Sequence, residues 1–182
     1  MSSSSFDLAP VEGPLSLERV DESFVLGVAE RRELAALFAA CFSCCRTDEE
    51  PAAADWRWLL RVDGRIACHV AVRRQGRTGR FRRLGHLAYC ATLPAWRCRG
   101  LGARLLRQVQ ADAPSLALDG VVLHAERDAV RLYQRAGWSE IAACAYYRAE
   151  RRRSEDPVLA WSPKPACVER LRCECYRFQR DW

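Results

Sequence analysis

Arginines and two closely spaced glycines gather at residues 97–102, between a strand-like run at 84–93 and an amphipathic pattern at 100–113. A turn from a strand into a helix aims backbone N–H groups and the positive end of the helix dipole at one point. Gly100 and Gly102 have no side chain, so the backbone there can approach a ligand closely. We therefore predict an anion-binding loop, with a pyrophosphate as its ligand.

Tyr133 is the second candidate for chemistry, because it lies on a predicted short helix that ends at Gly137. A tyrosine of ordinary pKa, about 10, is protonated at neutral pH and can give a proton to a leaving group. Tyr133 is also in helical register with Ala129, Leu132 and Ala136, so a purely structural place in the core is the alternative. The pattern by itself leaves both interpretations open.

The two segments together resemble the GNAT superfamily of acetyltransferases. The shared elements are Arg-x-x-Gly-x-Gly after a strand, at 97–102, and Ala-x-x-Leu-Tyr-x-x-x-Gly-Trp, at 129–138. The resemblance implies acetyl-CoA as co-substrate, Tyr133 as the acid that protonates the departing thiolate, and no metal ion. It also implies that strand and loop residues hold the acyl-CoA: Cys90, Ala91, Thr92, Arg97, Cys98, Arg99, Gly100, Leu101 and Gly102. Backbone N–H groups of that strand would polarise the acetyl carbonyl.

A closer resemblance is to the aminoglycoside 2′-N-acetyltransferases. It rests on several short stretches: Ala67-x-His69-x-Ala71-Val72, Asp55-Trp56, Trp96-Arg97, the charged residues 154–156 and Asp181-Trp182. It implies a small cationic acceptor with a primary amine, because ammonium groups bound away from water must be paired with carboxylates. The residues expected to bind the acceptor are Glu50, Asp55, Ala88, Tyr89, His124, Glu155, Asp156, Asp181 and Trp182.

The chain departs from these families at the position of the base. Ala88 stands where the closer family has a glutamate on the long strand. Glu126 is our candidate for the missing base, and His124 or His86 is the alternative, each acting through a water molecule. Cys98 also stands where the superfamily commonly has glycine. Two other functions therefore stay open: a non-catalytic regulatory module that binds acyl-CoA, and transfer of a longer acyl chain.

The elements that would position these groups follow from the hydrophobic periodicity. Residues 28–43 have helical spacing, and two alternating runs flank Asp63-Gly64, which is a strong hairpin signal. The further elements expected are a strand at 80–93, a helix at 100–113, a strand at 121–125, a helix at 129–136, strands at 138–149 and 167–178, and a charged loop at 151–157. This order predicts an α/β, GNAT-like mixed central sheet, with an antiparallel meander and a parallel pair at the CoA opening, flanked by helices.

Length and charge limit the classes of partner. We expect a flexible tail at 1–14 and a single domain at 15–182 of the 182-residue chain. No apolar run is long enough to span a membrane, and the start has no secretory signal, so we expect a cytoplasmic protein. The net charge of +6 comes from scattered arginines, densest at 73–83, which we interpret as a solvated rim and not a nucleic-acid site. A homodimer through the terminal strands stays open.

The ten cysteines are interpreted as reduced thiols. A zinc site from Cys41, Cys44, Cys45, Cys173 and Cys175 is the alternative. Cys41 falls on the apolar face of a helical pattern, and the last two cysteines are only two positions apart. Structural zinc sites usually have wider spacing, so we favour buried free thiols.

Overall fold

A seven-stranded mixed sheet forms the centre of the protein, in the order β1-β2-β3-β4-β5-β9-β6. The structure is a computed structural model that describes residues 13–21, 26–42, 54–75, 83–142 and 156–173, and the backbone alone at 145–147 and 152–154. The strands of the sheet are β1 (Leu15–Asp21), β2 (Trp56–Val62), β3 (Arg65–Gln75), β4 (Leu84–Thr92), β5 (Gly120–His124), β6 (Ser139–Ala142) and β9 (Val158–Trp161). β7 (Ala145–Tyr147) and β8 (Arg152–Ser154) pair separately.

Only β4 and β5 pair in parallel, and every other pair in the sheet is antiparallel. The predicted mixed sheet, with a meander and one parallel pair, is therefore confirmed. Asp63 and Gly64 have φ angles of +49° and +76°, as a tight hairpin turn between β2 and β3 requires. The Asp-Gly signal thus identified this turn correctly.

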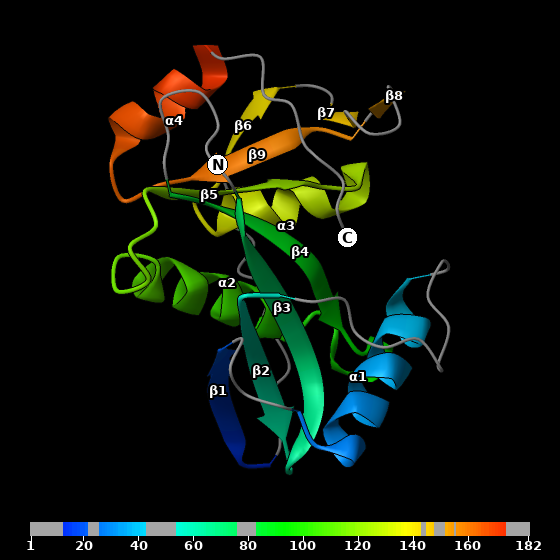
Figure 1. Ribbon diagram of the computed structural model, residues 1–182. Helices are drawn as coiled ribbons and strands as arrows, with labels where there is room; N and C mark the ends of the chain where they lie inside the picture. The colour runs from blue at the N-terminus through cyan, green and yellow to red at the C-terminus, as the bar shows by residue number, and fades with distance from the viewer. Residues whose placement is uncertain are drawn as a thin grey trace, which may run out of the picture.

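Helices cover both faces of the sheet (Figure 1). α1 (Val28–Cys41) and α4 (Pro165–Cys173) pack on one face, and α2 (Leu101–Asp112) and α3 (Val130–Arg135) pack on the other. Two short 3₁₀ helices, η1 (Pro94–Trp96) and η2 (Arg127–Ala129), precede α2 and α3. None of the helices in the described ranges has the length and apolar character that a membrane crossing needs.

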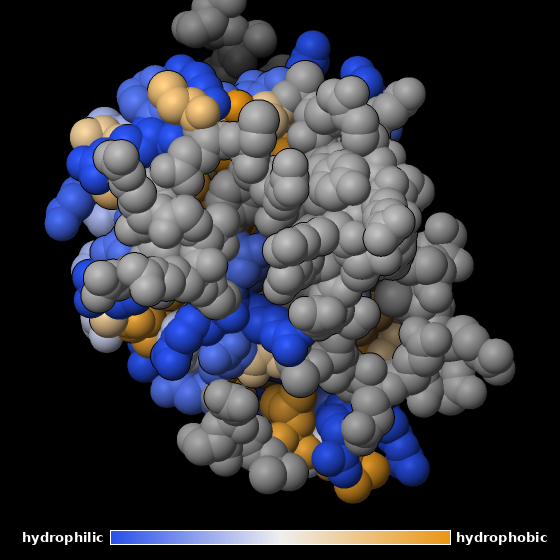
Figure 2. Space-filling view, turned by 45° about the horizontal axis from the view of Figure 1, so that its top comes forward, coloured by the Kyte–Doolittle hydropathy of each residue, from blue (hydrophilic) through white to orange (hydrophobic). Residues whose placement is uncertain are grey.

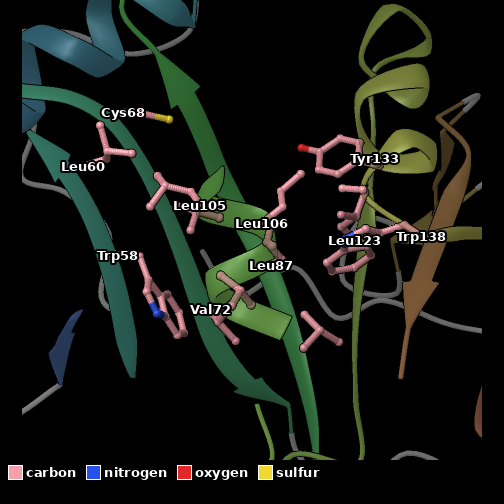
Figure 3. Packing of buried hydrophobic residues seen from close by; sticks show 14 of the residues in the cluster. Trp58, Leu60, Cys68, Val72, Leu87, Leu105, Leu106, Leu123, Tyr133 and Trp138 are labelled. Carbon is pink, nitrogen blue, oxygen red and sulfur yellow. The ribbon is translucent and has the colours of Figure 1, made fainter. Parts of the chain in front are cut away.

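The largest hydrophobic cluster lies between the sheet and the helices α2 and α3 (Figure 3). Leu101, Leu105 and Leu106 recur at helical spacing along α2 and are buried against the meander. Trp58, on β2, is fully buried there and donates from Nε1 to Asp112 Oδ2 at 2.7 Å. This packing fixes α2, and therefore the turn that precedes it, relative to β4.

On the face shown in Figure 2, hydrophilic residues cover most of the described surface, and hydrophobic ones show only in small separate areas. Among the described residues, Val28 is the one large hydrophobic side chain that is exposed. The apolar side chains of the described ranges are thus mostly buried in the core.

The C-terminal part of the fold differs from the prediction. The strand predicted at 167–178 is wrong over its first half, where α4 ends at Cys173. Val168 and Leu171, three residues apart, form its buried side, and Pro165 supplies the first residue of the helix. Residues 167–173 are therefore not available as a strand for the dimer contact that was left open.

Three strands were not predicted as such. β1 lies where no element was expected, β8 lies inside the predicted loop at 151–157, and β9 was not foreseen. The predicted strand at 138–149 is divided into β6 and β7. The predicted flexible tail lies outside the described residues up to position 12.

Candidate active site

An opening in the sheet lies between β4 and β5. These parallel strands pair only from Leu84↔Gly120 to His86↔Val122, and no register pair joins them beyond that point. Ala88, on the central strand β4, is half-buried, as are the two residues after it, whereas the first four residues of the strand are buried. The strands therefore diverge at the parallel pair, where the CoA opening was predicted.

A β-bulge on β4 coincides with this opening. The β3–β4 register passes from Ala71↔Ala88 to His69↔Ala91, so two steps on β3 face three on β4. Tyr89, at the bulge, has a φ of +51°, which a bulky side chain rarely adopts. Its ring stacks on Phe38 of α1, with the centroids 5.2 Å apart. The helix packing thus holds the bulge in place.

The predicted anion loop is a sharp turn at the end of β4. Gly100 is the N-cap residue of α2 and has a φ of +75°. Cys98 also lies in the left-handed region, with a φ of +58°, at the position where the superfamily commonly has glycine. The first helical bond runs from Arg104 N to Gly100 O at 3.0 Å, so the N–H groups of 101–103 precede it. These N–H groups form the donor set that an anion would use.

Gly102 has no conformational need to be glycine. It lies within α2 and does not have a positive φ. A Cβ built there would meet the Leu132 side chain at 3.6 Å and Thr92 Oγ1 at 3.7 Å, which is ordinary van der Waals contact. The fold itself therefore accepts a side chain at this position. The space that a side chain would take at Gly102 lies beside the N–H donors of the turn, so a phosphate could bind there.

The arginines of the loop have partners on either side of it. Arg97 donates from Nε to the Thr92 carbonyl at 3.1 Å, and its Nη2 lies 3.7 Å from Cys41 Sγ. The guanidinium of Arg99 lies over the Trp96 ring, 4.9 Å from its centroid. Arg97 thus connects the end of β4 to α1. Arg97 and Arg99 both place positive charge near the turn.

Tyr133 is buried at the opening, with 7% of its surface exposed. Its hydroxyl lies beside the thiol of Cys90 on β4, close enough for each group to affect the pKa of the other. In Figure 3 the Tyr133 hydroxyl and the Cys68 sulfur point toward one another. Burial, more than any neighbour, raises the pKa of Tyr133 well above 10, so its phenol keeps its proton at neutral pH.

The end of α3 holds Tyr133 in place. Gly137 has a φ of +86°, its N–H donates to Gln134 O at 3.0 Å, and Trp138 N–H donates to Tyr133 O at 3.0 Å. This is the Schellman arrangement, so the prediction of a C-terminal glycine at 137 is confirmed. The Trp138 ring also lies 6.1 Å from that of Tyr133.

Two thiols lie near Tyr133: Cys90, which was predicted to hold acyl-CoA, and Cys68, which was not predicted as a site residue. Cys68 Sγ lies 3.0 Å from Thr92 Oγ1, and burial raises the pKa of the Cys68 thiol. Burial also raises the pKa of Cys90 to about 11. Both groups therefore stay neutral, and neither is a thiolate nucleophile at neutral pH. The sequence contains one indication of this position, because Cys68 belongs to the alternating run of β3 and therefore faces inward.

The candidate bases lie within β4 (His86), at the last residue of β5 (His124) and just after β5 (Glu126). Glu126 is exposed just before η2, and its charge is among the smaller causes that raise the pKa of Tyr133. His124 is half-buried, and its ring lies 5.5 Å from that of His86. Burial first, and then His124 and Arg73, lower the pKa of His86 to about 3. The structure thus brings Glu126 near Tyr133 and keeps His86 neutral.

The predicted acceptor residues are placed in part. Asp55 accepts a 2.7 Å bond from the Arg74 backbone N–H, beside the start of β2. Asp156 is half-buried just before β9. Tyr89, like Ala88, is half-buried on β4, and its ring packs on Phe38 of α1. Glu50, Glu155, Asp181 and Trp182 lie outside the residues whose side chains the structure describes.

Within the described ranges no three His, Cys, Asp or Glu side chains come together as a metal site. Cys44, Cys45 and Cys175, three members of the alternative zinc set, lie outside those ranges.

A sequence model of the acetyltransferase (GNAT) family matches residues 31–138. The chain belongs to the GNAT family. The match includes the meander, the opening, the anion loop and Tyr133. The protein is therefore a GNAT acyl-CoA N-acyltransferase by family, as the two motifs predicted. No curated protein sequence matches the chain significantly.

Solved GNAT structures share the fold at low identity. An acyl-CoA N-acyltransferase from Pseudomonas aeruginosa has a TM-score of 0.62 and 18% identity, over 82% of this chain and 100% of the other. Arabidopsis thaliana Naa50, in complex with the bisubstrate analogue CoA-Ac-MVNAL, has a TM-score of 0.60 and 18% identity, over 81% and 98%. An aminoglycoside acetyltransferase from an uncultured soil metagenomic sample has a TM-score of 0.56 and 17% identity, over 67% and 90%. The TM-scores indicate a common fold.

Proposed function

We propose that this GNAT protein transfers an acetyl group from acetyl-CoA to the primary amine of a small cationic acceptor, with Tyr133 as general acid. One observation carries the proposal: the buried, protonated Tyr133 hydroxyl lies beside the sulfur of Cys90, at the opening between β4 and β5. A hydroxyl that reaches one sulfur beside β4 is in place to protonate another.

The donor would lie along β4. Its pyrophosphate would accept hydrogen bonds from the N–H groups at the start of α2, where Gly102 leaves room for close approach. The arm that carries the thioester would follow the strand from Thr92 to Cys90, whose half-buried residues lie in the opening. This path ends beside Tyr133.

Transfer needs one acid and one base. The neutral amine attacks the thioester carbon, the carbon–sulfur bond breaks, and the departing thiolate takes the proton of Tyr133. The attacking nitrogen gives its extra proton through water to the carboxylate of Glu126, which is exposed near Tyr133. The proton that Glu126 gains balances the one that Tyr133 loses, and the products are the amide and the CoA thiol.

Holding the two reactants together supplies much of the acceleration, since well-oriented groups reach effective molarities of about 10⁵ M or more. The acceptor would enter between α1 and α4, on the face where Ala88 and His124 are half-buried. One protein of related fold supports the choice of a cationic amine as acceptor, because it is described as an aminoglycoside acetyltransferase.

The test is release of the CoA thiol from acetyl-CoA over a panel of amines that includes an aminoglycoside, a polyamine and a peptide with a free α-amine. We expect turnover with at least one small cationic amine. Tyr133→Phe should lower kcat about 10²- to 10⁴-fold, the usual contribution of a general acid, and leave stabilisation by CoA intact. Turnover by Tyr133→Phe at the wild-type rate would refute the assigned acid.

The panel also separates the alternatives. Thermal stabilisation by CoA without turnover of any amine would favour the regulatory module. Faster turnover with octanoyl-CoA than with acetyl-CoA would identify the protein as a longer-chain acyltransferase.

A further inference from the structure

We propose that Arg57 and His69 are positioning residues, which fix the β4 bulge so that the Cys90 N–H points into the opening and donates to the thioester carbonyl. The proposal rests on the function proposed above. Neither residue contacts the reacting atoms in this arrangement. They act through the backbone of Tyr89.

The two side chains form a directed chain of hydrogen bonds. Arg57 Nη1 lies 3.2 Å from His69 Nε2, and His69 Nδ1 lies 2.9 Å from the Tyr89 carbonyl oxygen. A guanidinium has only donors, so Nε2 must accept and the ring proton must be on Nδ1. His69 Nδ1–H therefore donates to the Tyr89 carbonyl.

The tautomer is held by the surroundings. His69 is fully buried and Arg57 is 7% exposed. Burial first, and then the charge of Arg57, lower the pKa of His69 to about 3, so the ring stays neutral at physiological pH. The Phe38 ring packs edge-on against His69, with the centroids 5.0 Å apart. Neither the proton nor the ring is therefore free to change its place.

The held carbonyl sets the direction of the next N–H. The Tyr89 carbonyl and the Cys90 N–H belong to one planar peptide group, in which the two bonds point in opposite directions. The carbonyl is held toward His69 on β3, one neighbour of β4. The Cys90 N–H consequently points away from β3, toward the side on which β4 and β5 have diverged.

An arginine is a costly residue for this place. A buried guanidinium must be hydrogen-bonded to offset the loss of hydration, and apolar residues often fill such positions at least as stably. Burial lowers the pKa of Arg57, and the nearness of Tyr89 acts against this. A charge kept beside the bulge at such a cost is consistent with a positioning role. A role in packing alone would not need it.

The experiment compares the wild type, His69→Leu and His69→Asn. The first readout is the infrared carbonyl band of acetyl-CoA, labelled with ¹³C at the carbonyl and bound without an amine. A donor aimed at the carbonyl lowers its stretching frequency, so we expect a downshifted band in the wild type and loss of the downshift in His69→Leu. His69→Asn keeps an N–H near the Nδ1 position, so it should restore part of the downshift.

The second readout is kinetic. Loss of one oxyanion donor lowers kcat about 10²- to 10³-fold in other enzymes, and a donor that is only misaligned should cost less. We expect His69→Leu to lower kcat about 10- to 100-fold and to change the KM for acetyl-CoA less than about twofold. Arg57→Met, which removes the charge and keeps the side-chain length, should lower kcat in the same direction by a smaller factor.

Ile66→Ala is the control for a loss of stability, because Ile66 is buried under α1 on the same strand. It should lower the melting temperature but leave the carbonyl band and kcat as in the wild type. A wild-type band and kcat in folded His69→Leu would overturn the proposal. If that variant does not fold, the wild-type band in Arg57→Met would overturn it equally.

The outcomes separate this proposal from the proposed function. The expected pattern of bands without turnover of any amine would contradict the function and support the positioning role. Turnover with unchanged bands would support the function and refute the positioning role. Failure of acetyl-CoA to bind any variant would refute both.

Discussion

Gly102→Ala should make the fold more stable and the binding of acetyl-CoA weaker. The stabilising effect follows from the helix, because alanine is favoured over glycine by up to about 1 kcal/mol in helical positions. The new Cβ would meet side-chain atoms no closer than 3.6 Å, so no clash offsets that gain. For a chain of this length, 1 kcal/mol corresponds to a rise of about 2–4 °C in the melting temperature.

The binding effect follows from the donors at the start of α2. The N–H groups of 101–103 precede the first helical hydrogen bond, and a methyl group among them would hold a phosphate away from at least one. A hydrogen bond to a charged group contributes about 1.5–3 kcal/mol. The Kd for acetyl-CoA should therefore rise about 10- to 150-fold.

Calorimetric titration with acetyl-CoA and thermal unfolding without it measure the two effects independently. Gly137→Ala is the matched control, since Gly137 has a φ of +86° and no atom within 4 Å of a built Cβ. It should lower the melting temperature and leave the Kd unchanged. An unchanged Kd in Gly102→Ala would refute the assignment of this loop to the pyrophosphate, whatever the stability of the variant.

Three further predictions concern stability. Cys98→Gly should raise the free energy of unfolding by up to about 1 kcal/mol in chemical denaturation, because glycine adopts the φ of +58° without strain, and Cys98→Val should lower it. Trp58→Phe leaves Asp112 without its 2.7 Å donor, so it should cost about 1–3 kcal/mol in the same assay. The pKa values of His69 and His86 are lowered to about 3, so stability should be full above about pH 6.5 and be lost as the pH falls toward 3. Each histidine accounts for about 2 kcal/mol of the stability lost between pH 7 and pH 5. Urea unfolding at the two pH values should show that His86→Gln loses about 2 kcal/mol less than the wild type. An equal loss in the variant and the wild type would contradict the lowered pKa of His86.

Features that depend on local turn chemistry were predictable from the sequence. The hairpin at Asp63-Gly64 and the end of α3 at Gly137 both use positive φ angles, and the residues that allow them are recognisable one at a time. The turn at Gly100 belongs to the same class. Tyr133 became a candidate because a local pattern linked it to Gly137.

Features that depend on pairing between distant strands were not predictable in this way. β9 lies between β5 and β6, and its neighbours are the strands that end at His124 and Ala142. Its four residues are too few to show a period, and no turn signal indicates those partners. The residues that form α4 alternate well enough to suggest a strand, and only their packing on the sheet decides for the helix.

The residues proposed to hold the acyl-CoA were recognisable in the sequence, whereas the proposed positioning residues were not. Arg57 and His69 are 12 positions apart in the chain, and His69 and Tyr89 are 20 apart. Such contacts have no signature in either segment alone. The available signal was a charged residue between Trp56 and Trp58, in a strand where its neighbours are buried. A charged side chain in a buried strand needs a hydrogen-bonding partner, but the sequence does not identify that partner.

The bulge of β4 decides which side chains can meet at the site. Side chains of a regular strand alternate between faces, so Cys90 would share the α1 face with Ala88 if the strand were regular. The extra residue at the bulge instead returns Ala91 to the face of Ala88, since these two pair with His69 and Ala71 on β3. Cys90 is thereby turned to the opposite face, where Tyr133 of α3 lies beside it. One inserted residue thus brings the central strand and the proposed acid together, and the same residue presents the carbonyl that His69 holds.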